Sequence, residues 1–484
     1  MTAVIDEQID TAYDERGRVA SRSMSAHELG WSYVGRRLDS VRSTGVVDGE
    51  IRFAYNARSE VASTTSAAGR VDYVYDAASN VVKAGSMSVV RAPSTDFVDS
   101  TRVGVVRTEH GRDGFADAAS WSVRVGDEQD LAAEVVTRDR LGRIATRSLE
   151  GGGVESYEYD DEDRLTGVLR DGVLRERYAF DARGNRVSVL VDGVATAATF
   201  DADDRITRFG GSTFEYDVHG SMIRRRSDDG ADPVSYAYDA RGNLNAVAVS
   251  AGRVVTYRHD ALGRRIETRV NGERTGAFLY LGQLHPAVWL DADGDARANF
   301  VYATGGHAPD LMVLADGRTY RLVRDVRDSV RLVIDTETGD VVQRLDYSTW
   351  GDVTLDTNPG FQPFGYAGGL YEPDTRLVHF GAREYDPVLG QFLQRDPIES
   401  TTDEPYGYAN GNPVLNTDPT GLCVDARVGA EKCVVQDALL LELEGVTGGG
   451  TGGLGGATTG ATNLIPRPVP PVIDPTNAPP VNRP

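Results

Sequence analysis

Aromatic residues recur in pairs along the first 270 residues, and a single residue of variable character separates the two members of each pair. The clear pairs are Tyr73/Tyr75, Tyr157/Tyr159, Tyr178/Phe180, Phe214/Tyr216 and Tyr236/Tyr238. Residues two apart on a β-strand point to the same face, so each pair predicts a strand with both rings on one buried side. The intervening residues, among them Glu158 and Ala237, fit the opposite, less constrained face.

An aspartate follows each aromatic pair and begins a short D-x-x-G-R/N sequence or a variant of it. Asp accepts hydrogen bonds from backbone amides two residues on, and Gly or Asn tolerates positive φ, so this sequence predicts a turn. A second strand follows, for example over residues 186–191 or 264–270, and then another turn such as Asn271–Gly272. Each repeat is therefore predicted to be a β-hairpin.

The hairpins recur with a period of about 21 residues up to residue 270. The aspartates that mark the later copies are Asp139, Asp160, Asp181, Asp201, Asp217, Asp239 and Asp260. About a dozen copies predict roughly two dozen strands, and twist makes so large an antiparallel sheet coil, split or close. No long pattern of period 3.6 precedes residue 423. We therefore expect an all-β strip that spirals on itself, with stacked rings that form core rather than a ligand cage.

The densest stretch of the chain lies at residues 346–422, where Tyr, Gly, Pro and Asp are closely spaced. Asp-Pro pairs occur at Asp386–Pro387, Asp396–Pro397 and Asp418–Pro419. Proline fixes its own φ and restricts the residue before it, so each pair predicts a rigid turn. Asp396 and Asp418 are thus expected on fixed corners of the chain.

Two aspartates on rigid corners have a specific chemistry if the fold brings their carboxyl groups together. Repulsion between like charges raises the pKa of one carboxyl, which leaves an acid beside a base. Such a pair can activate a water molecule or polarise a peptide carbonyl, as an aspartic protease does. The alternative is that Asp396 and Asp418 only cap turns, and the residues by themselves leave both interpretations open.

The segments REYDPVLGQFLQRDPI at 383–398 and YGYANGNPVLNTDPTGL at 406–422 resemble the core domain of the Rhs (YD-repeat) family. This family includes bacterial polymorphic toxins and the C components of insecticidal Tc toxins. The resemblance implies that the repeats wind into a hollow YD-repeat β-shell, which the core domain closes. We expect the shell over residues 1–275, the core domain with a self-cleavage motif over 276–422, and a Gly/Pro-rich tail over 423–484.

The resemblance also implies a site. In this family the corresponding aspartates cut their own chain after the leucine of a DPxGL motif, with help from the arginine before the first aspartate. Carried over by position, Asp396 and Asp418 form the catalytic pair, Arg395 is the helper, and the bond between Leu422 and Cys423 is cut.

One residue of the motif departs from the family pattern. Glu399 stands where glycine is usual, which removes a permissive turn residue and adds a negative charge near Asp396. The expected enzymatic activity is at most cleavage of the chain's own backbone, and Glu399 is the feature that would abolish it.

We expect no cofactor and no metal site. Asp291, Asp293 and Asp295 have the spacing of calcium ligands in an EF-hand loop, but Ala296 and Tyr302 occupy the positions that require Gly and Glu. A polar hairpin turn is therefore expected there. The two cysteines both lie after residue 422, so neither braces the repeats, and no Cys/His set has zinc spacing.

The charge narrows the possible partners. A net charge of −22 argues against a nucleic-acid or anionic-membrane surface, because each favours a basic face. Solubility is the simple explanation of the acidity, and an acidic lining for a basic cargo is the alternative. No apolar run is long enough to span a membrane, and the first residues lack the basic and apolar parts of a secretory signal. We expect a protein that is cytoplasmic before export, then secreted or held at the cell surface by another route.

The tail after Leu422 has a different composition, with a Gly-rich and then a Pro-rich stretch that predict disorder. The expected function is a Rhs-type encapsulating shell, or a fragment of one, that self-cleaves after Leu422 in toxin delivery or interbacterial competition. Expected partners are its own C-terminal segment as cargo, secretion-system components and an immunity protein. The alternative is a cell-surface or extracellular YD-repeat protein for adhesion or carbohydrate binding without catalysis.

Overall fold

A computed structural model describes residues 8–424, except 93–96, 115, 127–128, 149–151, 232, 251 and 399–403. Within this part the chain is almost entirely β-structure, with two single-turn 3-10 helices. Residues Met1–Gly449 form one compact unit and Gly450–Pro484 a second, and only the first contains described residues. The expectations for the Gly/Pro-rich tail and for Glu399 concern residues outside the described part.

The repeats supply the strands up to residue 270. They are β1 (Ile9–Tyr13), β2 (Val19–Met24), β3 (His27–Val34), β4 (Arg37–Thr44), β5 (Gly49–Tyr55), β6 (Val61–Ser66), β7 (Gly69–Tyr75), β8 (Val81–Ala84), β9 (Met87–Arg91), β10 (Val98–Val103), β11 (Val106–Arg112), β12 (Ala118–Val125), β13 (Gln129–Arg138), β14 (Ile144–Ser148), β15 (Val154–Tyr159), β16 (Leu165–Arg170), β17 (Val173–Phe180), β18 (Arg186–Val191), β19 (Val194–Phe200), β20 (Ile206–Phe209), β21 (Ser212–Tyr216), β22 (Met222–Ser227), β23 (Val234–Tyr238), β24 (Leu244–Ser250), β25 (Arg253–His259) and β26 (Arg265–Val270).

The elements that follow are β27 (Glu273–Tyr280), β28 (Pro286–Leu290), β29 (Ala296–Val301), β30 (Leu311–Leu314), β31 (Thr319–Arg324), β32 (Val330–Asp335), β33 (Val341–Tyr347), β34 (Val353–Asp356), η1 (Tyr366–Gly368), β35 (Leu370–Glu372), β36 (Leu377–Phe380), β37 (Arg383–Asp386), β38 (Gln391–Phe392) and η2 (Ala409–Gly411).

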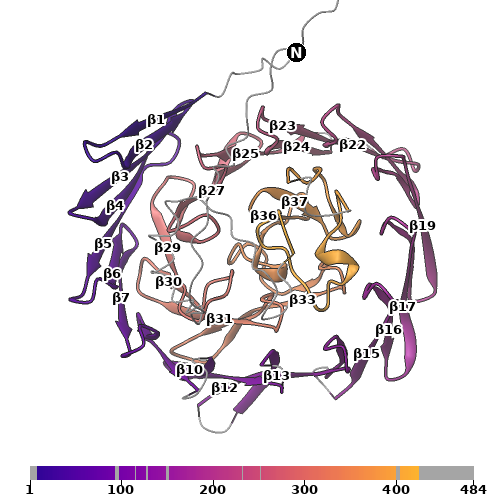
Figure 1. Cartoon of the computed structure of the whole chain (residues 1–484), viewed down its shortest axis with the longest axis horizontal. Helices are drawn as coiled ribbons and strands as arrows, with labels where there is room; N and C mark the ends of the chain where they lie inside the picture. Colours follow the sequence, from indigo (N-terminus) through magenta and orange to yellow (C-terminus); the bar gives the residue numbers. More distant parts are fainter. Residues whose placement is uncertain are drawn as a thin grey trace, which may run out of the picture. The chain divides into compact units, whose positions relative to one another are not determined.

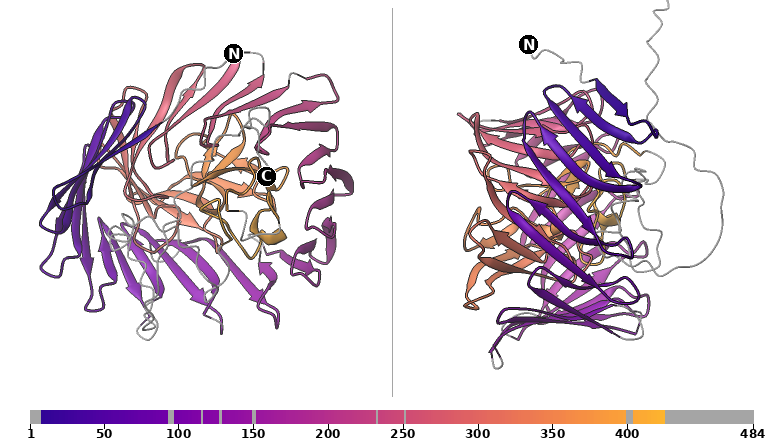
Figure 2. Two further views of the ribbon diagram at one scale, coloured as in Figure 1. Left: turned by 45° about the horizontal axis from the view of Figure 1, so that its top comes forward. Right: turned by 90° about the vertical axis from the view of Figure 1, so that its left-hand side faces the viewer.

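Consecutive strands pair antiparallel from β1 to β34 in one 34-stranded sheet, and β35–β38 form a separate four-stranded sheet. Within this unit the strip from β1 to β25 curves round a central region, and the strands after β26 lie inside it (Figure 1). Figure 2 shows the strands of the strip side by side as a continuous wall. The predicted all-β fold, in which repetitive antiparallel hairpins spiral into a shell, is confirmed. We call β1–β26 the wall and the elements from β27 onward the core.

The aspartate of each repeat holds its turn as predicted. The Oδ1 atom of Asp76 accepts hydrogen bonds from the amides of Ala78 (2.8 Å) and Asn80 (3.0 Å). The third residue after the aspartate has positive φ, as at Gly142 (φ 80°) and Ser79 (φ 68°). A type I turn closed by such a residue matches the right-handed twist of the two strands, which is why the turn sequence recurs.

In several repeats the tyrosine before the aspartate fastens its hairpin to the preceding strand. The hydroxyl of Tyr75 donates to the Val61 carbonyl (2.9 Å), and that of Tyr159 to the Ile144 carbonyl (2.6 Å). The strand register shifts at this tyrosine, as it does between Val74 and Tyr75. The tyrosine therefore marks a β-bulge, which increases the local twist and helps the strip to curve.

An arginine four residues after the aspartate links one repeat to the next. Arg143 pairs with Asp139 of its own turn (2.7 Å), and its guanidinium lies 4.7 Å from the centre of the Tyr159 ring in the following repeat. Arg164 lies over Phe180 in the same way, 4.9 Å from the ring centre. We expected stacked rings to tie neighbouring strands; the link that the structure shows is this cation–π contact.

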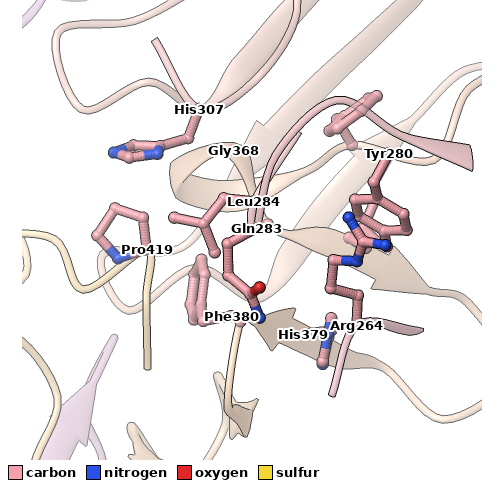
Figure 3. A pocket seen from close by; sticks show the side chains of 13 residues that line it. Arg264, Tyr280, Gln283, Leu284, His307, Gly368, His379, Phe380 and Pro419 are labelled. Carbon is pink, nitrogen blue, oxygen red and sulfur yellow. The ribbon is translucent and has the colours of Figure 1, made fainter. Parts of the chain in front are cut away.

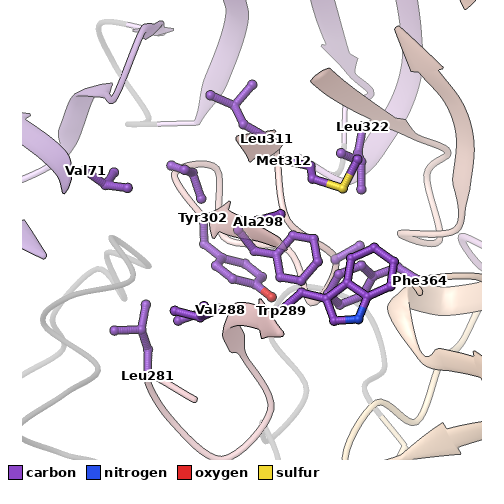
Figure 4. Close-up of a cluster of buried hydrophobic side chains, with 14 of the residues drawn as sticks. Val71, Leu281, Val288, Trp289, Ala298, Tyr302, Leu311, Met312, Leu322 and Phe364 are labelled. Carbon is purple, nitrogen blue, oxygen red and sulfur yellow. The ribbon is translucent and has the colours of Figure 1, made fainter. Parts of the chain in front are cut away.

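Buried side chains of the wall and the core form shared clusters. The largest contains Val71 of the wall together with Trp289, Met312 and Phe364 of the core (Figure 4). A second cluster joins Phe214 and Tyr236 of the wall to Leu389 and Leu393 of the core. The core is thus positioned by the wall's inner face.

The acidic run at 291–295 lies in the turn between β28 and β29. The Oδ1 atom of Asp291 accepts from the amides of Asp293 (3.0 Å) and Asp295 (2.9 Å), as in the YD turns. Among the described residues, no helix has the length and apolar character that crossing a membrane requires.

Candidate functional site

Asp396 and Asp418 lie close together in the core, on either side of Arg383. One guanidinium nitrogen, Nη2 of Arg383, is 3.1 Å from Asp396 Oδ2 and 3.3 Å from Asp418 Oδ2. All three residues are at most 3% exposed. The two carboxyl groups therefore share one buried cation, a geometry that turn-capping alone does not require.

Backbone hydrogen bonds bring these segments together. The Ala382 amide, just before β37, donates to the Thr420 carbonyl (2.9 Å), and the Asp396 amide donates to the Pro405 carbonyl (2.8 Å). Gly421 has φ +63°, and a Cβ there would lie 2.2 Å from the Phe380 carbonyl oxygen. The glycine of the DPTG sequence is therefore required for this close approach.

The bond predicted to be cut lies directly against Asp418. The Oδ1 atom of Asp418 accepts hydrogen bonds from the amides of Leu422 (3.2 Å) and Cys423 (3.2 Å). The Thr420 hydroxyl donates to the same oxygen (3.1 Å), and its own oxygen lies 3.1 Å from the Leu422 nitrogen and 3.3 Å from the Cys423 nitrogen. Arg383 Nε donates to the Gly421 carbonyl. The nitrogen of the Leu422–Cys423 peptide bond thus faces an aspartate.

The surroundings raise the pKa of both carboxyl groups. Burial raises the pKa of Asp418 to about 6, while the Arg383 guanidinium and the Thr420 hydroxyl act in the opposite direction. Burial also raises the pKa of Asp396, again against the effect of Arg383. The sequence led us to expect like-charge repulsion as the cause, whereas the largest cause is loss of solvation. One cation between two such carboxyls favours a single ionised partner.

Arg395, the predicted helper, directly precedes Asp396 in the chain. Its side chain is exposed and lies against Gly220, where an added Cβ would be 3.5 Å from the Arg395 Cβ. The arginine that contacts both aspartates is Arg383, which the sequence reasoning missed. The available signal was its place as the first residue of the REYDP motif. Glu399 is not among the described residues.

A small cavity of about 30 Å³ adjoins Pro419, the residue after Asp418. Leu284 and His307 lie beside Pro419, and Arg264 and His379 line the far end (Figure 3). The space suffices for water but not for an organic cofactor. In the described ranges, no group of three or more His, Cys, Asp or Glu side chains is placed to hold a metal ion.

The fold and this site define a class of protein: a shell scaffold built from YD hairpins, with paired aspartates in its core. The chain belongs to the Teneurin YD-shell family, whose model matches residues 33–414. It is 30% identical to teneurin-4 of Mus musculus over 303 residues, which cover 58% of this chain and 11% of that protein. It is also 30% identical to the tRNA nuclease WapA of Bacillus subtilis (strain 168) over 265 residues, 52% of this chain and 11% of WapA.

Among solved structures, TcdB2-TccC3 is similar with a TM-score of 0.47 and 14% sequence identity, covering 86% of this chain and 28% of that chain. The chain spans about a tenth of the length of the curated relatives it matches. The family model and the sequence relatives confirm the predicted YD-repeat family.

Proposed function

We propose that this YD-shell scaffold cuts its own chain between Leu422 and Cys423 and so separates the segment from residue 423 onward. One observation carries the proposal: the amide of Cys423 lies 3.2 Å from Asp418 Oδ1, and Arg383 joins Asp418 to a second buried aspartate, Asp396. A carboxyl at the leaving nitrogen and another beside it are the groups that hydrolysis of a peptide bond requires.

In the proposed reaction Asp396 is the base and Asp418 the acid. Ionised Asp396 takes a proton from a water molecule whose oxygen attacks the Leu422 carbonyl carbon. Protonated Asp418 gives its proton to the Cys423 nitrogen as the carbon–nitrogen bond breaks. The immediate products are a carboxylic acid at Leu422 and a neutral amine at Cys423, with Asp396 now protonated and Asp418 ionised, so one water is consumed and the protons balance. Arg383 opposes the effect of burial on the pKa of Asp396 and so favours its ionised form, while burial raises the pKa of Asp418 to about 6, so that part of Asp418 carries a proton near that pH.

The test is mass spectrometry of the purified chain after incubation at neutral pH without added protease. We expect fragments that end at Leu422 and begin at Cys423, and no such fragments from Asp396→Asn or Asp418→Asn, which keep the side-chain size but remove the ionisable group. Circular dichroism should show both variants folded. An intact wild-type chain after prolonged incubation would refute the proposal.

Acid breakage of Asp-Pro bonds is the artefact to exclude. It would produce fragments that begin directly after an aspartate, such as at Pro397 or Pro419, and these differ in mass from a fragment that begins at Cys423. Incubation of the wild type at several protein concentrations distinguishes two routes. The first-order rate constant for cleavage within one chain does not depend on protein concentration, whereas cleavage of one chain by another becomes faster as the concentration rises.

The wider function follows as part of the same proposal. We divide the chain into a shell (1–275), a core domain (276–422) and a released segment (423–484), which is the cargo in delivery of a toxin to competing cells. The nuclease activity in the name of WapA supports an association of this family with toxic enzymes. Secretion-system components and an immunity protein are the partners this function would require.

A further inference from the structure

Two buried histidines face each other where the wall meets the core, and one of them, His379, lines the small cavity at the end opposite Pro419. His259 ends β25 of the wall and His379 lies on β36 of the core, and their ring centres are 6.2 Å apart. Each residue is 8% exposed. Neither has a part in the proposed cleavage reaction.

The charges around these histidines are already balanced. Glu384 Oε1 lies 2.7 Å from His379 Nδ1 and 2.5 Å from Nη2 of Arg265, which belongs to β26 of the wall. The Arg265 guanidinium also lies 3.6 Å from the centre of the Tyr257 ring. One carboxylate therefore meets a permanent cation and two rings that can each gain a positive charge.

Other ionisable groups near the cluster do not change this balance. Arg241 of the wall acts on His259 and lowers its pKa further, whereas Glu372 of the core acts on Arg265 and Tyr257. Within the part of the chain that the structure describes, His259 Nε2 and Glu384 Oε2 have no hydrogen-bond partner. A proton on His259 Nε2 would thus add a positive charge without a hydrogen bond to receive it in this arrangement.

We propose that His259 and His379 form an acid-sensitive latch between wall and core, closed when both rings are neutral and opened when they take up protons. Opening separates β36 and β37 from β25 and β26, so that the rings and Glu384 gain water. Protonation of the two histidines is the signal, and the local separation of the wall from the core is the response.

The direction of the pH effect follows from linkage. Burial lowers the pKa of both histidines from the usual 6.5 in the closed state. Between that value and the lowered one, the open state binds protons that the closed state does not, so opening becomes more favourable as the pH falls. Each histidine contributes up to about a tenfold change in the opening equilibrium per pH unit, and two contribute up to about a hundredfold.

Hydrogen exchange of the full chain, read by mass spectrometry at about pH 7.5 and about pH 5.5, tests the latch. After correction for the intrinsic exchange rate, we expect peptides from β25 and β36–β37 to lose protection at least about tenfold at the lower pH. Peptides from β6–β7, far from the cluster, should keep theirs. Both histidines precede residue 422, so the measurement is valid whether or not the chain cuts itself.

Variants identify the groups responsible. His379→Gln keeps a hydrogen-bond donor for Glu384, and His259→Phe fills the same space; each should remove part of the pH-dependent loss, and together most of it. His219→Gln is the matched control because His219 is exposed. If a variant does not fold, the wild-type measurement still decides. Equal protection of β36–β37 at both pH values, or an unchanged loss in a folded double variant, would overturn the proposal.

Discussion

At the scale of single residues, Arg383 determines what Asp396 and Asp418 can do. Two buried carboxylates without a cation would both be protonated at neutral pH, because their desolvation is not compensated. One guanidinium between them offsets about one negative charge, so the state with a single proton on the pair is favoured. That state contains an acid and a base, which a pair of simple turn caps would not provide.

Replacing Arg383 should therefore affect cleavage more than replacing Arg395. We expect Arg383→Gln to lower the rate at neutral pH by about a hundredfold or more, the usual effect of losing one preorganised charged donor. Arg395→Gln should change the rate less than about tenfold, because its side chain is exposed. The measurement is the time course of the fragment that begins at Cys423, with Arg383→Lys as a variant that keeps the charge. A larger loss in Arg395→Gln would support the helper role that the family resemblance implied for Arg395.

Thr420 should set the pH dependence of the same reaction. Its hydroxyl donates to Asp418 Oδ1 and so stabilises the ionised form of that carboxyl. The acid must be protonated, so the wild-type rate should fall as the pH rises above about 6. Thr420→Val removes the donor and raises the pKa of Asp418, which should move this fall upward by about half to one pH unit. Thr420→Ser should restore the wild-type profile; a change in rate with no movement of the profile would assign Thr420 a purely structural role.

The sequence could indicate Asp396 and Asp418 but not how they are held. Proline after each aspartate marks a rigid corner, and this signal is local. The contact with Arg383 joins three segments through backbone pairing between residues 382 and 420 and between 396 and 405, which no short pattern encodes. Arg383 is buried and Arg395 is exposed, and the burial of a side chain depends on the complete fold rather than on a local sequence pattern.

At the scale of elements, the repeats were predictable because each one is held by contacts within about 20 residues. The aspartate satisfies amides of its own turn, and the tyrosine reaches one strand back, so the period appears directly in the sequence. Strands predicted at 186–191 and 264–270 correspond to β18 and β26 almost to the residue. The inward course of β27–β34 was less evident, because those strands are buried against the wall by clusters of residues distant in sequence.

The hydroxyl of the tyrosine before the repeat aspartate should contribute measurably to the stability of the wall. Tyr75→Phe removes the donor to the Val61 carbonyl without changing the ring, and we expect a loss of about 1 kcal/mol in the free energy of unfolding. Tyr13→Phe is the control, since Tyr13 is 63% exposed. Urea unfolding of both variants provides the comparison. Equal stability of the two variants would show that the aspartate turn and ring burial alone hold the repeat.

At the scale of the whole described unit, wall and core depend on each other. The largest buried cluster takes Trp31 and Trp121 from the wall and Trp289 from the core, and Trp350 of the core packs with Leu165 and Tyr178 of the wall. Arg186 of β18 also donates to the Leu389 carbonyl (2.6 Å) and lies over the Trp350 ring. Separating the two parts would expose apolar surface on both, at about 25 cal/mol for each Å².

The four tryptophans allow this dependence to be measured. Replacing Trp31 and Trp121 with Phe leaves reporters only in the core, and replacing Trp289 and Trp350 leaves them only in the wall. We expect the fluorescence of each double variant to change at the same urea concentration as its own circular dichroism at β-sheet wavelengths, because the shared cluster makes wall and core unfold together. Repeat proteins can instead unfold in stages when their units contact only neighbours. A core signal that changes at lower urea than the wall signal would therefore show that the boundary proposed at 275/276 separates independent domains, and that the wall is stable without its core.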